Sequence, residues 1–227
     1  MVRGWPAHAF VPCGAAIHMR ILGLLGVLWF TSCSVFGIRD TPEPPYKTLD
    51  QLGPVVIRQY GPRIAAETTI EGDEFAARST GFRRLAGYIF GANHARTSIA
   101  MTAPVAQVPG SVAATIGMTA PVAAESTSPG VWEIRFFMPP NFTLATLPVP
   151  DDASVHLVQL PAETYAVLRF SGFASVQAIQ NRTAKLLETL RGGDWVQAGT
   201  PVVWFYDPPW TLPPLRRNEV AVAVQMR

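Results

Sequence analysis

Alternating apolar and polar positions run through most of this chain and predict a series of short strands separated by prolines and glycines. A period of two is typical of strands with one buried face. We expect nine such strands, at residues 55–60, 64–70, 99–106, 114–122, 131–138, 155–160, 162–170, 202–206 and 219–226. Strands this short and this numerous indicate a sheet-rich domain.

Two segments have instead the 3.6-residue period of amphipathic helices. The first covers residues 74–90, with Asp73 as its expected N-cap. Its apolar face is formed by Phe75, Phe82, Leu85, Ala86 and Ile89. The second covers residues 174–190, and its apolar stripe is formed by Val176, Ile179, Thr183, Leu186, Leu187 and Leu190.

A repeated phrase stands out between the two helices. Residues 99–106 read IAMTAPVA, and residues 116–123, seventeen positions further on, read IGMTAPVA. The pair Pro109-Gly110 between them is typical of a type II turn, so we expect a hairpin that places Met101 opposite Met118. Two interpretations are open: the hairpin is purely structural, or its two thioethers line a ligand pocket.

The order strand, helix, strand, strand occurs twice. The first unit comprises residues 64–70, 74–90, 99–106 and 114–122, and the second comprises residues 162–170, 174–190, 202–206 and 219–226. Two such units can close their strands into one sheet with a helix on each side. The strands at 55–60, 131–138 and 155–160 then extend or connect the halves. The expected fold is therefore α+β, with duplicated β-α-β-β units forming a distorted antiparallel β-barrel flanked by two helices.

The first 33 residues have the pattern of an export signal. Met19-Arg20 precedes the apolar run 21–30, whose length suits a signal peptide better than a membrane span. The small residues before Cys33 resemble a bacterial lipoprotein signal, in which the cysteine is lipidated, although Phe30 stands where leucine is usual. We expect translation to start at Met19; an uncleaved signal anchor and a simple secretory signal are the alternatives.

This interpretation predicts a leader at residues 1–32, a tether at 33–45 and a domain at 46–227. Lipidation of Cys33 would anchor the protein to a membrane of the cell envelope. Ser34 after the cysteine, in place of aspartate, favours the outer membrane, with the domain on its periplasmic side.

Charge and cysteine content exclude several classes of function for the domain. Without the two arginines of the leader, 16 basic residues balance 16 acidic ones, so no basic field for nucleic acid exists. Cys13 and Cys33 are the two cysteines of the chain, which excludes a disulfide framework, a thiol nucleophile and a zinc thiolate site after residue 33. We expect a monomer without a nucleic-acid partner.

Nothing in the domain sequence argues for catalysis. Its two histidines, His94 and His156, have no partner at metal-ligand spacing, and we expect both at the surface. Phosphate-binding loops, nucleophile elbows and paired-carboxylate motifs do not occur. We therefore expect a binding protein and not an enzyme.

Several motifs resemble the SOUL heme-binding protein family. They are YGP at 60–62, GFRRLAGYIFGAN at 81–93, both MTAPV phrases, FMP at 137–139, RFSGF at 169–173 and YDPPWTLPPLRRNEV at 206–220. The resemblance covers nearly the whole domain, from about Tyr46 to Val224. It implies a duplicated strand-helix-strand-strand fold, shared with the effector-binding domains of some transcription regulators, and non-catalytic binding of heme or a related tetrapyrrole.

The resemblance also suggests where such a ligand binds. A heme site needs a flat apolar surface, cations for the propionates and, optionally, an axial ligand to iron. The first helix can offer Phe82, Ala86 and Gly87 as surface and Arg83 as cation. The alternative is that Phe82 and Ala86 pack in the core and that Arg83 is solvated.

One departure from the family concerns the iron. Some members have a histidine, proposed as axial ligand, immediately before the YGP motif, where this chain has Gln59. Met101, Met118, Tyr60 or His94 could ligate in principle, and other members are described as binding heme without such a histidine. A binder of another small hydrophobic ligand on the same fold, with weak or no heme affinity, is the alternative.

Overall fold

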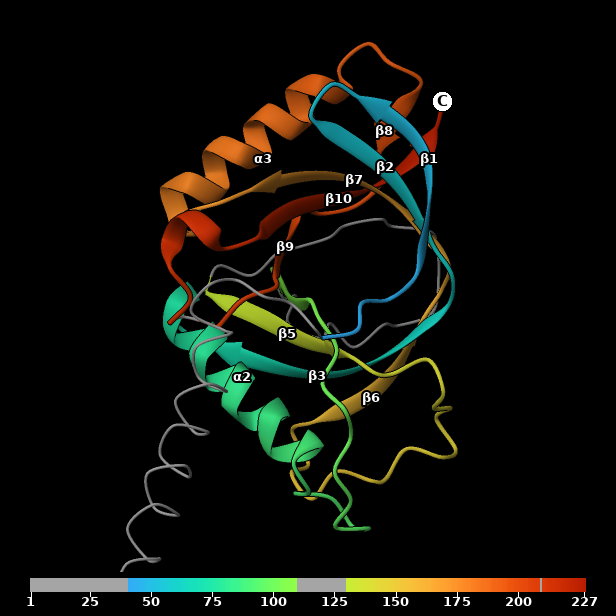
Figure 1. Cartoon of the computed structure of the whole chain (residues 1–227), viewed down its shortest axis with the longest axis vertical. Coiled ribbons are helices and arrows are strands. Elements are labelled where there is room, and N and C mark those ends of the chain that lie inside the picture. Colours follow the sequence, from blue (N-terminus) through green and yellow to red (C-terminus); the bar gives the residue numbers. More distant parts are fainter. Residues whose placement is uncertain (1–40, 110–129, 209) are drawn as a thin grey trace, which may run out of the picture.

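The computed structural model describes residues 41–109, 130–208 and 210–227 of the chain (Figure 1). These residues form two long helices, α2 (Glu74–Ile89) and α3 (Val176–Leu190), a short 3-10 helix η1 (Pro213–Leu215), and ten strands. The strands are β1 (Tyr46–Leu52), β2 (Val55–Tyr60), β3 (Arg63–Glu71), β4 (Val105–Pro109), β5 (Val131–Phe137), β6 (His156–Leu160), β7 (Glu163–Phe170), β8 (Trp195–Gln197), β9 (Val202–Phe205) and β10 (Asn218–Met226).

The strands make one curled sheet in the order β1-β2-β7-β10-β9-β4-β5-β3-β6, with β8 paired to β10. All pairs are antiparallel. Among the described residues the end strands β1 and β6 do not pair with each other, so the sheet is an open half-barrel (Figure 1). This confirms the expected α+β class, with an antiparallel barrel-like sheet flanked by two helices.

The duplication is visible in the pairing. In the unit β3-α2-β4-β5 the last strand lies between the other two, and the same holds in the unit β7-α3-β9-β10. Strands β4 and β9 pair with each other and join the halves. The strand that precedes each unit pairs with the first strand of the other unit: β2, before the first unit, pairs with β7, and β6, before the second, pairs with β3.

Among the described residues, the strand that completes the first unit is β5, which we had expected to extend or connect the halves. Residues 114–122, the expected fourth strand, lie outside the described residues. The expected hairpin is wrong for residues 105 and 106, because Val105–Gln107 pairs with β5 on one edge and with β9 on the other. The strand starts only after Pro104, which has no N–H for the ladder. The second copy of the phrase, with Met118, lies outside the described residues.

Helix α2 begins as expected at Asp73, whose carboxylate accepts hydrogen bonds from the backbone N–H groups of Phe75 (2.9 Å) and Ala76 (3.0 Å). The expected apolar face was partly wrong, because Phe75 is 67% exposed and Phe82 is 40% exposed. The buried positions are Ala77, Gly81, Leu85, Tyr88 and Ile89.

Gly81 explains this rotation of α2. A Cβ atom at Gly81 would lie 2.4 Å from Cγ1 of Ile134 on β5, so the helix meets the sheet at a position without a side chain. Because α2 approaches β5 closely at Gly81, the side of the helix with small residues, Ala77 and Gly81, faces β5. The two phenylalanines are left at the margin and on the outer side of the helix.

Helix α3 is capped by Ser175, whose hydroxyl accepts from the backbone N–H of Ala178 (3.3 Å). Leu186 and Leu190 are buried against β7 and β10, which confirms the C-terminal part of the expected stripe. Val176 is 50% exposed, so the stripe does not extend to the first turn.

Apolar side chains fill both faces of the sheet. One face carries a core under each helix. The other face, inside the curl, carries a third core formed by Tyr60, Ala65, Ala106, Phe137, Val167, Val202, Trp204 and Ala221. Trp204 lies at its centre, with ring centroids 5.7 Å from Tyr60 and 5.2 Å from Tyr165. The inside of the half-barrel is therefore packed with aromatic rings.

The last residues of the expected tether contact the domain. The carbonyl oxygen of Pro42 accepts from the backbone N–H of Ala103 (2.9 Å), and Glu43 pairs with Arg217 (2.7 Å). Cys33 and the leader lie outside the described residues, so their roles stay predictions. Neither described helix has the length and apolar content that a membrane crossing requires.

Candidate functional site

Two of the four residues expected to bind a ligand, Phe82 and Arg83, are exposed on α2. The ring of Phe82 is 5.3 Å from that of Phe136 at 63°, while 40% of the residue stays exposed. Arg83 is exposed, and its Nε donates to the carbonyl oxygen of Ser79 one turn earlier (3.3 Å). A partly anchored aromatic ring and a solvent-facing cation thus occupy consecutive positions of α2.

Ala86 and Gly87 lie one turn further along α2. Ala86 is half-buried and packs against the core beneath the helix. Gly87 is half-buried, and a Cβ atom there would be 3.9 Å from Cβ of Ala92, an ordinary contact. The sequence left open whether Phe82 and Ala86 form a ligand surface or pack in the core. Ala86 packs against the core, whereas Phe82 is 40% exposed. A binding role for all four stays a prediction.

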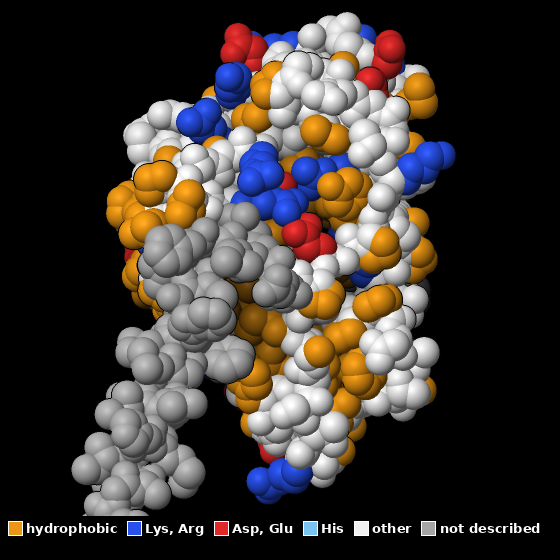
Figure 2. All heavy atoms as spheres, viewed as in Figure 1, with side chains coloured by type: hydrophobic (Ala, Val, Ile, Leu, Met, Phe, Trp, Pro, Cys, Tyr) orange, Lys and Arg blue, Asp and Glu red, His pale blue; other side chains and the backbone are white. Residues whose placement is uncertain are grey.

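Further apolar residues are exposed that were not expected as part of a ligand site. The guanidinium of Arg78 lies 5.3 Å from the ring of Phe75 and 4.3 Å from that of Phe205 on β9. Phe173, before α3, and Trp210, before η1, are 68% and 63% exposed. Figure 2 shows hydrophobic side chains gathered where α3 and η1 approach α2. Their exposure depends on how three distant segments pack, which no local pattern reports.

Position 59 does not belong to the same site. Gln59 is exposed on β2, opposite Lys47 and Thr164, while the adjacent Tyr60 is buried. Strand β2 and helix α2 lie on opposite sides of the molecule (Figure 1). A histidine at this position, as in some family members, would therefore be far from Phe82.

The other candidate iron ligands are also remote or enclosed. His94 is exposed, with Nε2 3.8 Å from Oδ1 of Asp151, and His156 is exposed on β6, which confirms the expected surface positions. Tyr60 belongs to the aromatic core, where burial raises its pKa to about 12, and Met101 packs against the core beneath α2. The described residues contain no cluster of acidic, histidine or cysteine side chains suited to a metal ion.

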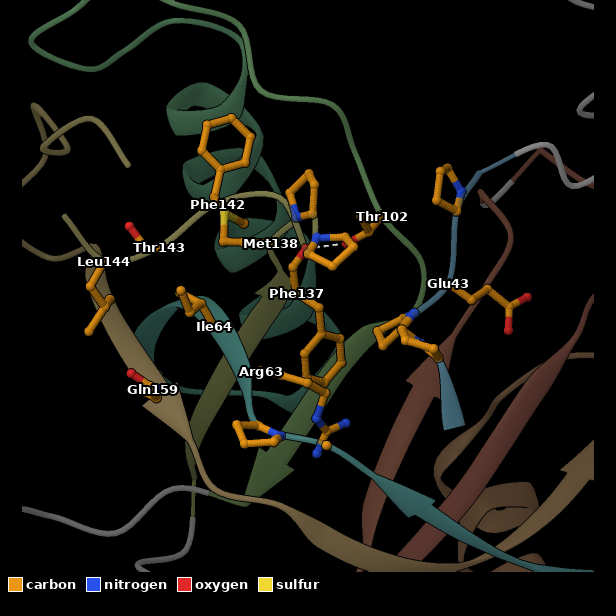
Figure 3. A pocket seen from close by; sticks show the side chains of 17 residues that line it. Glu43, Arg63, Ile64, Thr102, Phe137, Met138, Phe142, Thr143, Leu144 and Gln159 are labelled. Carbon is orange, nitrogen blue, oxygen red and sulfur yellow. Dashed lines mark hydrogen bonds between the residues drawn. The ribbon is translucent and has the colours of Figure 1, made fainter. Parts of the chain in front are cut away.

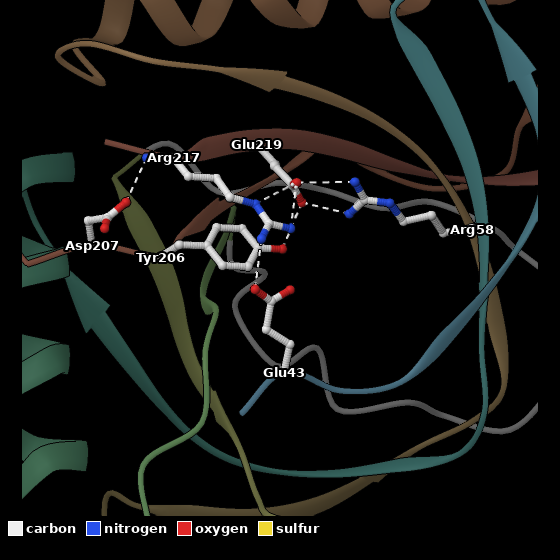
Figure 4. Close-up of polar contacts among 6 residues, drawn as sticks. All are labelled: Glu43, Arg58, Tyr206, Asp207, Arg217 and Glu219. Atoms are coloured by element: carbon white, nitrogen blue, oxygen red, sulfur yellow. Dashed lines mark hydrogen bonds and ion pairs between the residues drawn. The ribbon is translucent and has the colours of Figure 1, made fainter. Parts of the chain in front are cut away.

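A buried charge cluster joins β2, β10, the segment that follows β9 and the N-terminal segment (Figure 4). Glu219 is fully buried and accepts from Arg58 (2.8 and 3.2 Å), from Nε of Arg217 (3.1 Å) and from the hydroxyl of Tyr206 (2.7 Å). Burial alone would raise the pKa of Glu219, but hydrogen bonds and charge from Arg58 and Arg217 lower it below its usual value. This carboxylate already has two cationic partners, so it has a structural role.

A pocket of about 300 Å³ opens where β3 begins and β5 ends (Figure 3). We call it the proline pocket, because its lining comprises Pro42, Glu43, Pro44, Pro45, Gly61, Pro62, Arg63, Ile64, Thr102, Phe137, Met138, Pro139, Pro140, Phe142, Thr143, Leu144 and Gln159. Thr102, from the first MTAPV phrase, donates its hydroxyl to the carbonyl of Phe137. Met101 does not line this pocket, and neither does any expected site residue of α2.

Comparison with known proteins agrees with this architecture. The profile of the family described as SOUL heme-binding protein matches residues 41–223. Heme-binding protein 2 of Mus musculus is 33% identical over 144 residues, 62% of this chain and 63% of that protein. Heme-binding protein 2 of Homo sapiens is 31% identical over 160 residues, 67% of this chain and 70% of that protein.

Solved structures show the same fold at much lower identity. The C-terminal domain of EcmrR matches 80% of this chain and 99% of its own, with a TM-score of 0.53 and 12% identity. A hydrolase from Listeria innocua matches 82% of this chain and 94% of its own, with a TM-score of 0.51 and 9% identity. These likenesses show a common fold alone. From the family match over nearly the whole described region, we conclude that this chain belongs to the SOUL heme-binding protein family.

Proposed function

We propose that this protein binds heme or a related tetrapyrrole, without catalysis, on the outer face of α2. Family membership and the name of its mammalian relatives support the class of ligand. The observation that carries the location is Phe82, an aromatic ring that is 40% exposed although it is anchored on Phe136, with the exposed Arg83 beside it.

The chemistry of the α2 face fits such a ligand. Phe82, Ala86 and Gly87 would contact the macrocycle, whose burial of apolar surface supplies the affinity. Arg83 would meet a propionate, and Arg78, held between two rings, adds a second cation nearby. The described histidines are both exposed and Gln59 is remote. We therefore expect binding to depend on these contacts and not on an imidazole bond to iron.

A hemin titration of the purified protein tests this proposal. We expect a saturable, one-to-one shift of the Soret band, and Phe82→Ala should weaken binding about tenfold, as loss of a central aromatic contact does. Leu49→Ala, which removes an exposed side chain on β1, is the matched control and should not change the affinity. No shift at tens of micromolar hemin, or equal effects of both substitutions, would contradict the proposal.

A second candidate function is binding of another small hydrophobic ligand on the same fold. The proline pocket, which lies apart from the expected heme surface, favours it. Mass spectrometry of ligands retained through native purification separates the two: a tetrapyrrole supports the first proposal, and a different apolar compound supports the second.

We further propose that the protein is held at the cell envelope by a lipid on Cys33. The support is the basic start, the apolar run and the small residues that precede this cysteine. We expect Cys33→Ala to move the protein from the membrane fraction to the soluble fraction, with hemin binding unchanged. Retention of the variant in the membrane with its leader intact would favour an uncleaved signal anchor instead.

A further inference from the structure

We infer that the proline pocket binds a compact aromatic monocarboxylate whose carboxylate is recognised by Arg63. This goes beyond heme binding on α2, because no residue of the proposed α2 site lines the pocket. It rests on three observations: the unused Nε donor of Arg63, the apolar lining of the pocket, and the ion pairs already made by the ionisable residues in that lining.

Arg63 offers a donor that the described protein does not use. Its side chain is only 9% exposed, and its Nη2 donates to Glu163 Oε2 (3.1 Å). The Nε atom is buried without an acceptor among the described residues. An unpaired buried N–H is costly, so an arriving acceptor would gain more here than at the surface.

Aromatic rings hold this guanidinium in place. Its Cζ atom lies 4.5 Å from the ring centroid of Tyr60, 5.0 Å from that of Phe137 and 5.8 Å from that of Tyr165. Cation–π contacts and the ion pair with Glu163 therefore orient it before a ligand arrives. Figure 3 shows Arg63 beside the Phe137 ring, with Phe142 and Leu144 across the pocket from them.

The rest of the lining suits a flat apolar body. Ile64, Met138, Phe142 and Leu144 supply apolar side chains, and six prolines add rigid rings that lose little entropy on binding. A volume of about 300 Å³ is at the lower end for small-molecule pockets. The occupant is thus a compact ring system and not a large flexible chain.

The charges in the lining leave one donor of Arg63 unused, while the carboxylate of the lining is already bound. The other ionisable side chain in the lining is Glu43, whose carboxylate is already bound by Arg217 at 2.7 Å. Glu163, the partner of Arg63, is outside the lining and also accepts from the hydroxyl of Tyr165 (3.0 Å). A carboxylate is the group that matches the remaining Nε donor, because hydrogen bonds between ionised groups are the strong ones.

Titration with 1-naphthoate and its neutral analogue 1-naphthamide tests the inference. We expect saturable binding of 1-naphthoate to the purified protein, at least about tenfold tighter than 1-naphthamide. Arg63→Gln should abolish this difference and leave the amide's affinity unchanged. Arg169→Gln, an exposed arginine on β7, is the matched control and should bind as the unmodified protein does.

A second variant covers the case in which Arg63→Gln does not fold. Leu144→Trp places bulk in the pocket and should weaken 1-naphthoate at least about tenfold, whereas Leu212→Trp, outside the pocket and similarly exposed, should not. Equal affinity for the acid and the amide, no effect of Leu144→Trp, or competitive displacement of 1-naphthoate by hemin would overturn the inference. A negative hemin titration would not affect it, so the two proposals fail separately.

Discussion

Replacing Glu219 by Gln is expected to lower the free energy of unfolding by about 3–5 kcal/mol at pH 7. The substitution keeps the shape of the side chain and removes its charge. Arg58, which is only 6% exposed, would then lie beside a fully buried neutral group, whereas Arg217 would keep its ion pair with Glu43 (2.7 Å). An uncompensated buried charge is much more costly than a buried pair, which is why one removed partner has so large an effect.

The effect of Glu219→Gln should depend on pH in a defined direction. The pKa of Glu219 is lowered in the folded protein, so its contribution is fully present above the ordinary glutamate pKa of about 4.3. That contribution is lost as pH falls through the folded value. Urea unfolding at pH 7, 5 and 3 should therefore show a constant difference between the proteins at pH 7 and 5 and a smaller one at pH 3.

Glu188→Gln provides the comparison for this prediction. Glu188 is exposed on α3, and loss of an isolated surface charge changes stability by no more than about 0.5 kcal/mol. If Glu219→Gln costs no more than this control, Glu219 does not act as the counter-charge of the two arginines.

The second large effect concerns Gly81. We expect Gly81→Ala to lower the free energy of unfolding by about 1–3 kcal/mol, as overpacking does, although alanine is the better helix former by about 1 kcal/mol. The new Cβ would lie 2.4 Å from Cγ1 and 2.8 Å from Cβ of Ile134, and Ile134 is fully buried. Neither atom can yield without moving α2 away from β5.

Gly87→Ala is the matched control, because Gly87 lies in the same helix and its added Cβ would make only an ordinary contact at 3.9 Å. This substitution should stabilise by about 0.5–1 kcal/mol, the opposite sign. Thermal unfolding of both variants measures the contrast. Equal effects would contradict a close approach at Gly81, whereas a smaller penalty of Gly81→Ala in an Ile134→Ala background would support it.

Local patterns predicted most of the elements. The strand at 55–60 and the start of α2 at Glu74 were found where expected, because alternation and an N-cap act through neighbouring residues. The strands β1 and β8 were missed. In β1 most residues are exposed, so its sequence has no apolar alternation to detect.

Local patterns did not predict which strands pair with each other in the sheet. The repeated phrase has the same alternation in both copies, but the neighbours of β4 are β5 and β9, which come from elsewhere in the chain. Likewise, α2 was expected to bury Phe75 and Phe82. The absence of a side chain at Gly81 decides how the helix meets Ile134, and this depends on the opposing strand.

By itself, the sequence determined the α+β class, the duplicated unit, the family resemblance and the adjacency of Phe82 and Arg83 on one helix, since these depend on residues close together in the chain. Only the tertiary structure decided which charges are buried. Arg58 meets Glu219 across 161 residues, and Arg63 meets Glu163 across 100. The environment of an arginine is set by such distant contacts, and so the cluster around Glu219 and the cluster around Arg63 became visible only in the folded chain.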